Sequence, residues 1–252
     1  MKGVHRGRRW ARRALLAVFA LVMLLTCAGI WYVSDFYHAD GTALAARADA
    51  DGDADGVEVR ELSERLVAFV PDRPVAGLVF YPGAKVEATS YAPLLTKCAE
   101  RGMLCVLVCP RLNIALLDAD AAEGVQEAFP DVDEWMIGGH SLGGVAACSY
   151  VAGHEGEYRD LVLLASYPAA DLSDFDGECL LLVGTEDGVL NWESYEESAA
   201  RLPARTREER IDGGNHANYG NYGAQAGDGD ATISRDEQQR QSVEAILSLV
   251  GD

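Results

Sequence analysis

The sequence predicts an α/β fold in which a mostly parallel central sheet is covered by helices on both faces. Short, nearly continuous apolar segments alternate with segments of helical periodicity over most of the chain, which is typical of parallel strands buried between helices. The length of 252 residues and a composition of 49% hydrophobic and 24% charged residues fit one globular domain with short appendages. A fully disordered chain, a collagen and a multi-span channel are therefore excluded.

The apolar segments place the strands at residues 65–70, 76–81, 103–109, 134–139, 160–166, 179–184 and 206–211. The helices are expected at residues 91–101, 118–129, 141–152, 192–202 and 234–250. The interval 167–178 is too short to hold lid helices, so we expect an open site without a lid. No glycine-rich phosphate loop with a lysine follows a strand, which argues against a nucleotide hydrolase.

The first 33 residues predict one transmembrane helix ahead of this fold. Residues 1–13 contain six basic residues and no acidic one, and residues 14–33 contain no charge. A helix of about 20 apolar residues crosses a hydrocarbon core of about 30 Å. The positive-inside rule then places the basic head in the cytoplasm. We expect a membrane anchor at 14–33, a single-pass location in the cell membrane and an extracytoplasmic body.

Two alternatives to this anchor would also export the body. A cleaved signal peptide would use Thr26 and Ala28 as the small residues before the cut. A lipoprotein would carry its lipid on Cys27, for which the preceding Thr26 is a poor residue. Apolar residues continue past both cut sites, which favours the uncleaved anchor.

The rest of the chain is strongly acidic. The net charge is −19, and outside the basic head 15 basic residues face 40 acidic ones. Such a surface repels a phosphate backbone, so we expect no nucleic-acid partner. Residues 34–56 are rich in Ala, Asp and Gly without periodicity, which predicts an acidic linker before a folded domain at 57–252. The linker begins like an EF-hand loop at Asp51, Asp53 and Asp55, but Leu62 occupies the position of the bidentate glutamate, which argues against calcium.

The six cysteines indicate neither a disulfide framework nor a zinc site. Cys105 and Cys109 would lie about 13 Å apart along one strand, too far for a bridge. A bridge between Cys98 and Cys105 stays open in an oxidising compartment, but most cysteines are expected as small buried hydrophobic residues. No pair has zinc-ligand spacing with a histidine nearby. We expect no metal and no cofactor.

The strongest motif is a G-x-S-x-G turn, which reads Gly139-His140-Ser141-Leu142-Gly143 and lies between a predicted strand and a predicted helix. That context is the one a nucleophile elbow requires. Gly139 and Gly143 relieve the crowding of the tight turn, which lifts the hydroxyl of Ser141 above the sheet edge. The helix that follows favours developing negative charge near this serine. The motif predicts a nucleophilic serine.

A serine nucleophile needs a base, and His216 is the histidine best placed to be one. The other four histidines lie in the head, the linker, the elbow and a short turn. A base in turn needs an acid that fixes its tautomer. Asp187 follows the strand 179–184 and is our candidate, with Glu186 as the fallback.

An oxyanion hole requires two backbone N–H groups. Leu142, the residue after the nucleophile, is expected to supply one of them. The loop after the strand 76–81 is expected to supply the other, from Ala84, with Gly83 allowing the backbone to turn. Lys85 either adds positive charge at the mouth of the site or is simply solvated.

These motifs resemble one known family. The chain from about residue 76 to 249 is similar to the short, lidless bacterial branch of the α/β hydrolase superfamily, with dienelactone-hydrolase-like relatives. The resemblance is carried by YPGAKV, GGHSLGG, LLASYPAADLSD, GTEDGV and GGNHANYGNYGAQAGDGDATISRDEQ. It implies an α/β hydrolase fold at 57–252 and a serine hydrolase, often anchored or exported. The order Ser141, Asp187, His216 is the chain order of that fold.

Two positions depart from the pattern of the relatives. Ala84 stands where similar chains often have a second glycine, which does not matter if only its amide is used. Ser141 stands where a dienelactone hydrolase has cysteine, so that activity is not implied. We expect a membrane-anchored, exported serine hydrolase that cleaves a small-molecule ester or acyl substrate through an acyl-enzyme. A non-catalytic binding protein on the same fold, and an acyltransferase or peptidase with the same triad, remain the alternatives.

Overall fold

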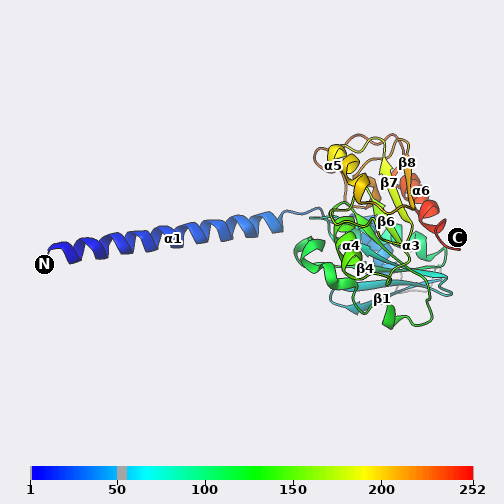
Figure 1. Ribbon diagram of the computed structural model, residues 1–252, viewed down its shortest axis with the longest axis horizontal. Coiled ribbons are helices and arrows are strands. Elements are labelled where there is room, and N and C mark those ends of the chain that lie inside the picture. Colours follow the sequence, from blue (N-terminus) through cyan, green and yellow to red (C-terminus); the bar gives the residue numbers. More distant parts are fainter. Residues whose placement is uncertain (1, 50–55, 252) are drawn as a thin grey trace. The chain divides into compact units, whose positions relative to one another are not determined.

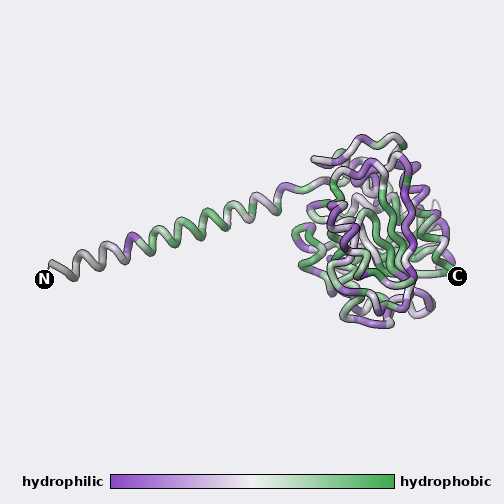
Figure 2. Tube along the Cα trace, turned by 45° about the horizontal axis from the view of Figure 1, so that its top comes forward, coloured by the Kyte–Doolittle hydropathy of each residue, from purple (hydrophilic) through white to green (hydrophobic). Residues whose placement is uncertain are grey.

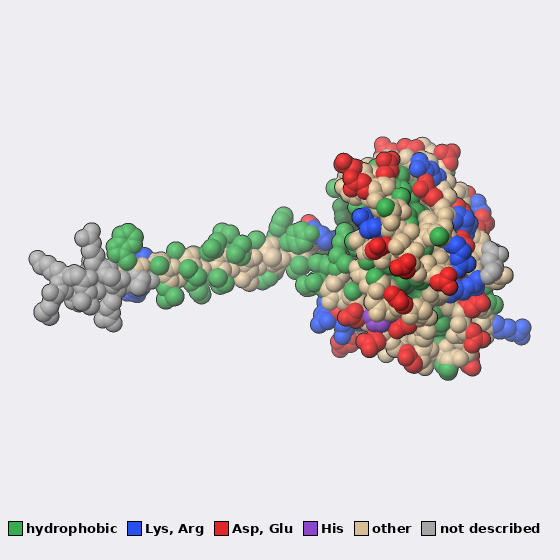
Figure 3. All heavy atoms as spheres, in the orientation of Figure 1, with side chains coloured by type: hydrophobic (Ala, Val, Ile, Leu, Met, Phe, Trp, Pro, Cys, Tyr) green, Lys and Arg blue, Asp and Glu red, His purple; other side chains and the backbone are tan. Residues whose placement is uncertain are grey.

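The computed structural model describes residues 2–49 and 56–251 and divides the chain into two compact units, one ending at Phe36 and one beginning at Tyr37 (Figure 1). The first unit is helix α1 (Lys2–Ser34). Its portion Arg12–Ser34 contains an 18-residue window with a mean hydropathy of 2.5 and is long and apolar enough to cross a membrane. Figure 3 shows hydrophobic side chains along this portion, and acidic side chains spread over the visible face of the second unit.

The expected linker at 34–56 is only partly correct, because helix α2 (Gly41–Asp49) lies within it. The carboxylate of Asp40 accepts the N–H of Ala43 at 3.0 Å and caps the first turn. The side chain of Ala43 is fully buried, and α2 packs on helix α3 (Ala92–Ala99). The Ala-rich composition that resembled a linker therefore forms a docked helix. The three aspartates of the EF-hand-like segment lie outside the described residues.

The second unit contains an eight-stranded sheet with the order β1-β2-β4-β3-β5-β6-β7-β8. Strands β3 to β8 pair in parallel, and β1 and β2 add an antiparallel edge. The strands are β1 (Val57–Ser63), β2 (Leu66–Pro71), β3 (Ala76–Tyr81), β4 (Met103–Val108), β5 (Trp135–His140), β6 (Asp160–Leu164), β7 (Cys179–Gly184) and β8 (Thr206–Ile211). Strand β1 is not among the predicted strands, because it is a charged edge strand whose mostly exposed residues conceal its alternation.

Two hydrophobic cores cover the two faces of the sheet, and successive residues of a strand pack alternately into one core and the other. In β3, Leu78 and Phe80 join the core beneath α3 and α6 (Arg235–Leu247), whereas Val79 and Tyr81 join the core beneath α4 (Leu142–Gly153). Within the second unit, Figure 2 shows the central strands mostly in the green of hydrophobic residues. The remaining regular segments are α5 (Trp192–Glu197) and the 3₁₀ helices η1 (Ala88–Tyr91), η2 (Arg111–Asn113), η3 (Ala115–Ala122), η4 (Gln126–Ala128), η5 (Ser198–Arg201) and η6 (Ala217–Tyr219).

The predicted helix at 118–129 is wrong, because this region forms the short 3₁₀ helices η3 and η4. Asp118 has a non-helical backbone (φ −135°), and its carboxylate accepts hydrogen bonds from Arg65 and Arg111. Gly124 then takes a positive φ of 75°, which ends any helical run. Side-chain contacts at Asp118 therefore override the local helical pattern.

All six cysteines are free, and Cys98, Cys105, Cys148 and Cys179 are buried, as small hydrophobic residues are. The bridge between Cys98 and Cys105 is not formed. Burial and the neighbouring Cys98 raise the pKa of the Cys105 thiol.

Candidate active site

Ser141 lies directly after β5, at the sharp turn into α4. Its backbone has φ 53° and ψ −125°, a strained conformation for a residue with a side chain. Its N–H donates to the Leu164 carbonyl at 2.9 Å, and its carbonyl accepts the hydroxyl of Ser166 at 2.7 Å. The turn is therefore tied on both sides to β6 and the residues that follow it.

The two glycines of the elbow, Gly139 and Gly143, are needed because the main chain at the end of strand β3 packs directly against them. A Cβ on Gly143 would lie 2.2 Å from the Tyr81 carbonyl oxygen, and one on Gly139 would lie 2.6 Å from the same atom. Real Cβ atoms do not approach that closely. The predicted requirement for glycine is thus explained by one neighbour, Tyr81, which is the last residue of the adjacent strand.

The structure brings Asp187 and His216 together from the loops after β7 and β8. His216 Nδ1–H donates to Asp187 Oδ2 at 2.8 Å, and both side chains are buried. The other carboxylate oxygen of Asp187 accepts the N–H groups of Val189 and Leu190 at 2.9 and 2.8 Å. Glu186, the fallback acid, is exposed, and its hydrogen bond is with Thr185. Asp187 is therefore the acidic partner of His216.

The second ring nitrogen of His216, Nε2, is buried and has no hydrogen-bond partner among the described residues. With Nδ1 donating to Asp187, this Nε2 is an acceptor. The ring centroid of His216 lies 4.5 Å from that of His140, the residue directly before Ser141. The fold thus places His216 Nε2, an unpaired nitrogen that can accept a proton, beside the elbow.

The loop after β3 carries the second predicted oxyanion donor. No carbonyl or side chain in the described part of the chain accepts the N–H of Ala84 or of Leu142, so both remain available to a substrate oxygen. The N–H of Lys85, which has a φ of 58°, is used by the Asn113 carbonyl at 2.7 Å.

Gly83 begins a turn, because its carbonyl accepts the N–H of Val86 at 3.3 Å. A Cβ on Gly83 would also lie 2.9 Å from both Tyr91 Oη and His140 Nδ1. Gly83 therefore makes room for a close contact that the sequence did not predict.

Tyr91 and His140 form a buried pair that the sequence analysis did not identify. Tyr91 Oη accepts the N–H of Gly83 at 3.0 Å and donates to His140 Nδ1 at 2.7 Å. Burial, and then the charge of His216, hold the pKa of His140 well below its usual range, so its ring is neutral. The pair links the oxyanion loop to the elbow. No local pattern in the sequence marks it, because Tyr91 begins a predicted helix.

Asp228 is a second residue that sequence reasoning missed. Its Oδ1 accepts the N–H groups of Gly188 and His216, each at 3.2 Å, and that of Gly229 at 2.9 Å, while its Oδ2 accepts the N–H of Ala217 at 2.8 Å. One carboxylate therefore joins the loop of Asp187 to the loop of His216. The only hint in the sequence is an acidic residue between two glycines.

In the described ranges, no three His, Cys, Asp or Glu side chains are grouped as metal ligands. The interval 165–178 between β6 and β7 contains no helix or strand, so the structure places no lid helix over the edge at which Ser141 lies.

Comparison with known proteins agrees with this architecture. The profile of the Alpha/beta hydrolase family matches residues 77–240, whereas no curated protein matches the chain. Three solved structures with similar folds are a CIB-like hydrolase from Thermoplasma acidophilum (14% identity, TM-score 0.54, 76% of this chain and 97% of that one), Est1E from Butyrivibrio proteoclasticus (11%, 0.57, 78% and 100%) and TT1662 from Thermus thermophilus (15%, 0.56, 78% and 99%).

At such low identity the solved structures establish the fold alone. The family match covers the elbow and the loops that carry Asp187 and His216. With its mostly parallel sheet and helices on both faces, the chain belongs to the alpha/beta hydrolase family.

Proposed function

We propose that the protein is a membrane-anchored, exported serine hydrolase that cleaves carboxylic esters of small molecules through Ser141, His216 and Asp187. The observation that carries the proposal is the placement of His216. One ring nitrogen is held by a buried carboxylate, and the other is left unpaired beside a strained serine turn. A histidine that is oriented by a carboxylate through one nitrogen and offers the other as a free acceptor is what a general base for a serine requires.

The geometry supports a two-step reaction. His216 Nε2 takes the hydroxyl proton of Ser141 as Oγ attacks the ester carbonyl, and Asp187 stabilises the imidazolium that forms. The oxyanion is stabilised by the N–H groups of Leu142 and Ala84. The ester C–O bond then breaks, and the alcohol leaves with the proton from His216. Water attacks the acyl-enzyme in the second step, its proton passes to His216, and the carboxylic acid is released as the serine hydroxyl re-forms.

The anchor and the export belong to the same proposal. Helix α1 contains an apolar portion long enough to span a bilayer, and basic residues precede it. These features favour a basic head in the cytoplasm and a hydrolase unit outside. Protease added to intact protoplasts is expected to digest the body and to leave a small protected stub. A body that is protected until lysis would reverse the topology, and a free body beginning near residue 29 would establish a cleaved signal.

Covalent labelling with a fluorophosphonate tests the chemistry. The full-length protein in detergent is expected to be labelled and to hydrolyse p-nitrophenyl acetate, and Ser141→Ala should abolish both. Ser149→Ala is the matched control, because Ser149 is an exposed serine on the same helix. Full labelling of Ser141→Ala would refute the assignment. Labelling without turnover of any ester would favour a binding protein or an acyl transfer to another acceptor.

A further inference from the structure

We propose that the site takes esters with a long, hydrophobic acyl chain presented at a membrane surface, and that an exposed leucine rim binds this chain. The leucine rim consists of Leu112, Leu116 and Leu117 on the segment after β4. This inference rests on the proposed function and specifies its substrate class.

The first argument is the distribution of exposed apolar side chains. Single exposed hydrophobic residues are normal on a soluble surface, whereas a cluster indicates a binding face. Six large hydrophobic side chains are exposed among the described residues of the second unit, namely Leu44, Val75, Leu112, Leu116, Leu117 and Leu142. Four of these six belong to the leucine rim and to the first residue of α4. The exposed leucines are therefore concentrated on the segment η2–η3 and at the start of α4.

The second argument is the position of these elements beside the elbow. The N–H of Lys85 in the oxyanion loop donates to the carbonyl of Asn113, the residue after Leu112, at 2.7 Å. The segment η3, which carries Leu116 and Leu117, packs against α4. Helix α4 begins at Leu142, directly after Ser141. The segment of the rim thus contacts both the oxyanion loop and the helix that begins directly after Ser141.

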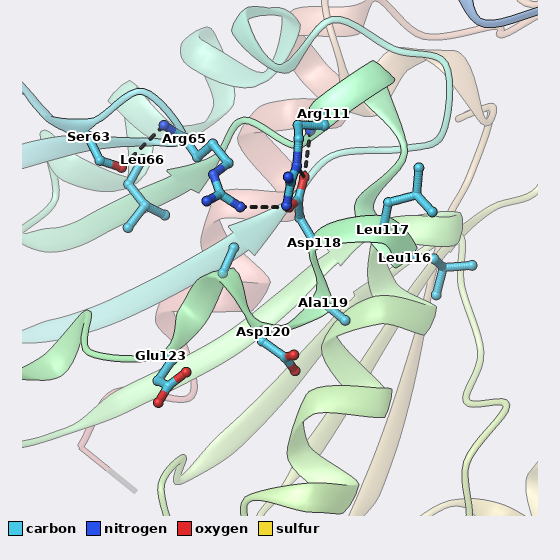
Figure 4. A pocket seen from close by; sticks show the side chains of 11 residues that line it. Ser63, Arg65, Leu66, Arg111, Leu116, Leu117, Asp118, Ala119, Asp120 and Glu123 are labelled. Carbon is cyan, nitrogen blue, oxygen red and sulfur yellow. Dashed lines mark hydrogen bonds and ion pairs between the residues drawn. The ribbon is translucent and has the colours of Figure 1, made fainter.

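The third argument is that contacts of the buried Asp118 side chain hold the segment of the leucine rim in place. The Asp118 side chain is 1% exposed and forms ion pairs with Arg65 and Arg111, both at 2.7 Å. It also accepts the backbone N–H of Arg111 at 2.6 Å. Figure 4 shows this cluster, with Leu116 and Leu117 beside each other and pointing away from the arginines. Together with the polar residues shown, the two leucines line an open depression of about 520 Å³.

The fourth argument concerns the source of the ester. Tyr37, the first residue of the second unit, pairs with Val86, and its N–H donates to the Lys85 carbonyl at 2.7 Å. Only Asp35 and Phe36 separate Tyr37 from the last residue of α1. Such a stretch reaches about 11 Å at most, a limit that the covalent chain imposes for any arrangement of the two units. If α1 spans a bilayer, the oxyanion loop stays near the lipid headgroups, where long-chain esters are found.

The test uses the full-length protein in phosphatidylcholine vesicles. The substrates are p-nitrophenyl acetate, p-nitrophenyl octanoate dissolved as monomers, and p-nitrophenyl palmitate dissolved in the vesicles. The rim variant carries Leu112→Ser, Leu116→Ser and Leu117→Ser. The matched control carries Leu44→Ser and Val75→Ser, two exposed apolar residues on other elements. Far-ultraviolet circular dichroism and the thermal midpoint establish that each variant is folded.

We expect the wild-type protein to hydrolyse the vesicle-borne palmitate ester with the highest kcat/KM. The rim variant should lose about 10- to 100-fold on the palmitate ester, because three partly exposed leucines would no longer cover its chain. Its rate on the acetate should stay within about twofold of the wild-type rate. The control variant should match the wild type on all three substrates.

Three outcomes would overturn the inference. Equal losses on acetate and palmitate in a folded rim variant would show that the leucines have a structural role. A higher kcat/KM for the monomeric octanoate than for the vesicle-borne ester would exclude the membrane surface as the source. Acetate hydrolysis by the wild type without any preference for long chains would refute the substrate class and leave the proposed function standing. Absence of hydrolysis of every ester would instead refute the proposed function itself.

Discussion

The turn that carries Ser141 and the loops that carry Asp187 and His216 are all held by close main-chain packing, but the loops are also joined to each other by a side-chain carboxylate. At the elbow, two glycines meet the carbonyl of Tyr81 too closely for any Cβ. In the other two loops, a Cβ on Gly184 would lie 2.3 Å from the Gly214 carbonyl oxygen, and one on Gly229 would lie 2.1 Å from the Glu186 carbonyl oxygen. In addition, the carboxylate of Asp228 accepts four backbone N–H groups and joins these loops to each other.

This difference has a physical consequence. Close packing of main chain against main chain has no alternative arrangement, because interiors are dense and respond poorly to added volume. A hydrogen-bonded loop can lose one contact and still keep its fold. We therefore expect the elbow to lose its geometry when a Cβ is added at its packed glycines, and the loops to lose alignment by degrees when the Asp228 carboxylate is altered.

The largest effect is expected at the acid. Asp187→Asn removes the carboxylate that receives His216 Nδ1–H, so the histidine loses its fixed tautomer, and kcat should fall about 10⁴-fold. The measurement is steady-state hydrolysis of p-nitrophenyl acetate. Glu186→Gln is the matched control and should retain nearly the wild-type rate, because Glu186 is exposed and bonded to Thr185. If instead Glu186→Gln lost the activity and Asp187→Asn kept it, the assignment of the acid would be wrong.

The elbow is tested by adding one methyl group. In Gly143→Ala the new Cβ would lie 2.2 Å from the Tyr81 carbonyl oxygen, so β3 and the elbow must separate. We expect a loss of about 1–3 kcal/mol in the free energy of unfolding, together with loss of fluorophosphonate labelling. Gly153→Ala lies on the same helix with nothing within 4 Å of its Cβ, so its stability should be unchanged or higher by up to about 1 kcal/mol. Normal labelling of Gly143→Ala would contradict the packing argument.

The residues of the elbow and the loops also show what could be predicted from the sequence. The elbow is a local motif, and its position between a strand and a helix follows from periodicity over about twenty residues. The triad residues were chosen by elimination and by strand ends, and the structure does bring Asp187 to His216. The parallel strands were found because burial on both faces leaves a continuous apolar run.

The failures share one cause, which is contact between residues far apart in the chain. The carboxylate of Asp228 accepts the N–H of Gly188, which is 40 residues away in the chain. The hydroxyl of Tyr91 is hydrogen-bonded to His140, which is 49 residues away. The region around Asp118 forms 3₁₀ turns in place of the predicted helix, because the Asp118 carboxylate is bound by Arg65, which is 53 residues away in the chain. Helix α2 looked like a linker because its stability comes from packing on α3. Local propensity contains none of these interactions.

A smaller effect than at the elbow is expected for Asp228. Asp228→Asn replaces one acceptor oxygen by an amide group that faces backbone donors, so the loops of Asp187 and His216 shift relative to each other. We expect kcat to fall about 10- to 100-fold, with KM and the thermal midpoint little changed and with a displaced pH profile of kcat. Asp230→Asn, an exposed aspartate two residues away, should behave like the wild type. A drop in thermal stability without any change in the pH profile would indicate a purely structural role.

The smallest effect concerns the neutral ring of His140 and appears only on acidification. Burial and the charge of His216 lower the pKa of His140 in the folded protein, whereas in the unfolded chain it titrates near the ordinary value of about 6.5. Below that pH the unfolded state binds more protons than the folded one. The free energy of unfolding must therefore decrease as the pH decreases, by up to about 1.4 kcal/mol for each pH unit. His140→Asn keeps an acceptor for Tyr91 but cannot titrate, so urea unfolding between pH 7 and 5 should show a shallower loss of stability. His154→Asn, a partly exposed histidine stacked on Tyr150, is the matched control and should keep the wild-type slope. If His140→Asn kept that slope as well, the acid sensitivity would come from another group, and His140 would not be held neutral by its surroundings.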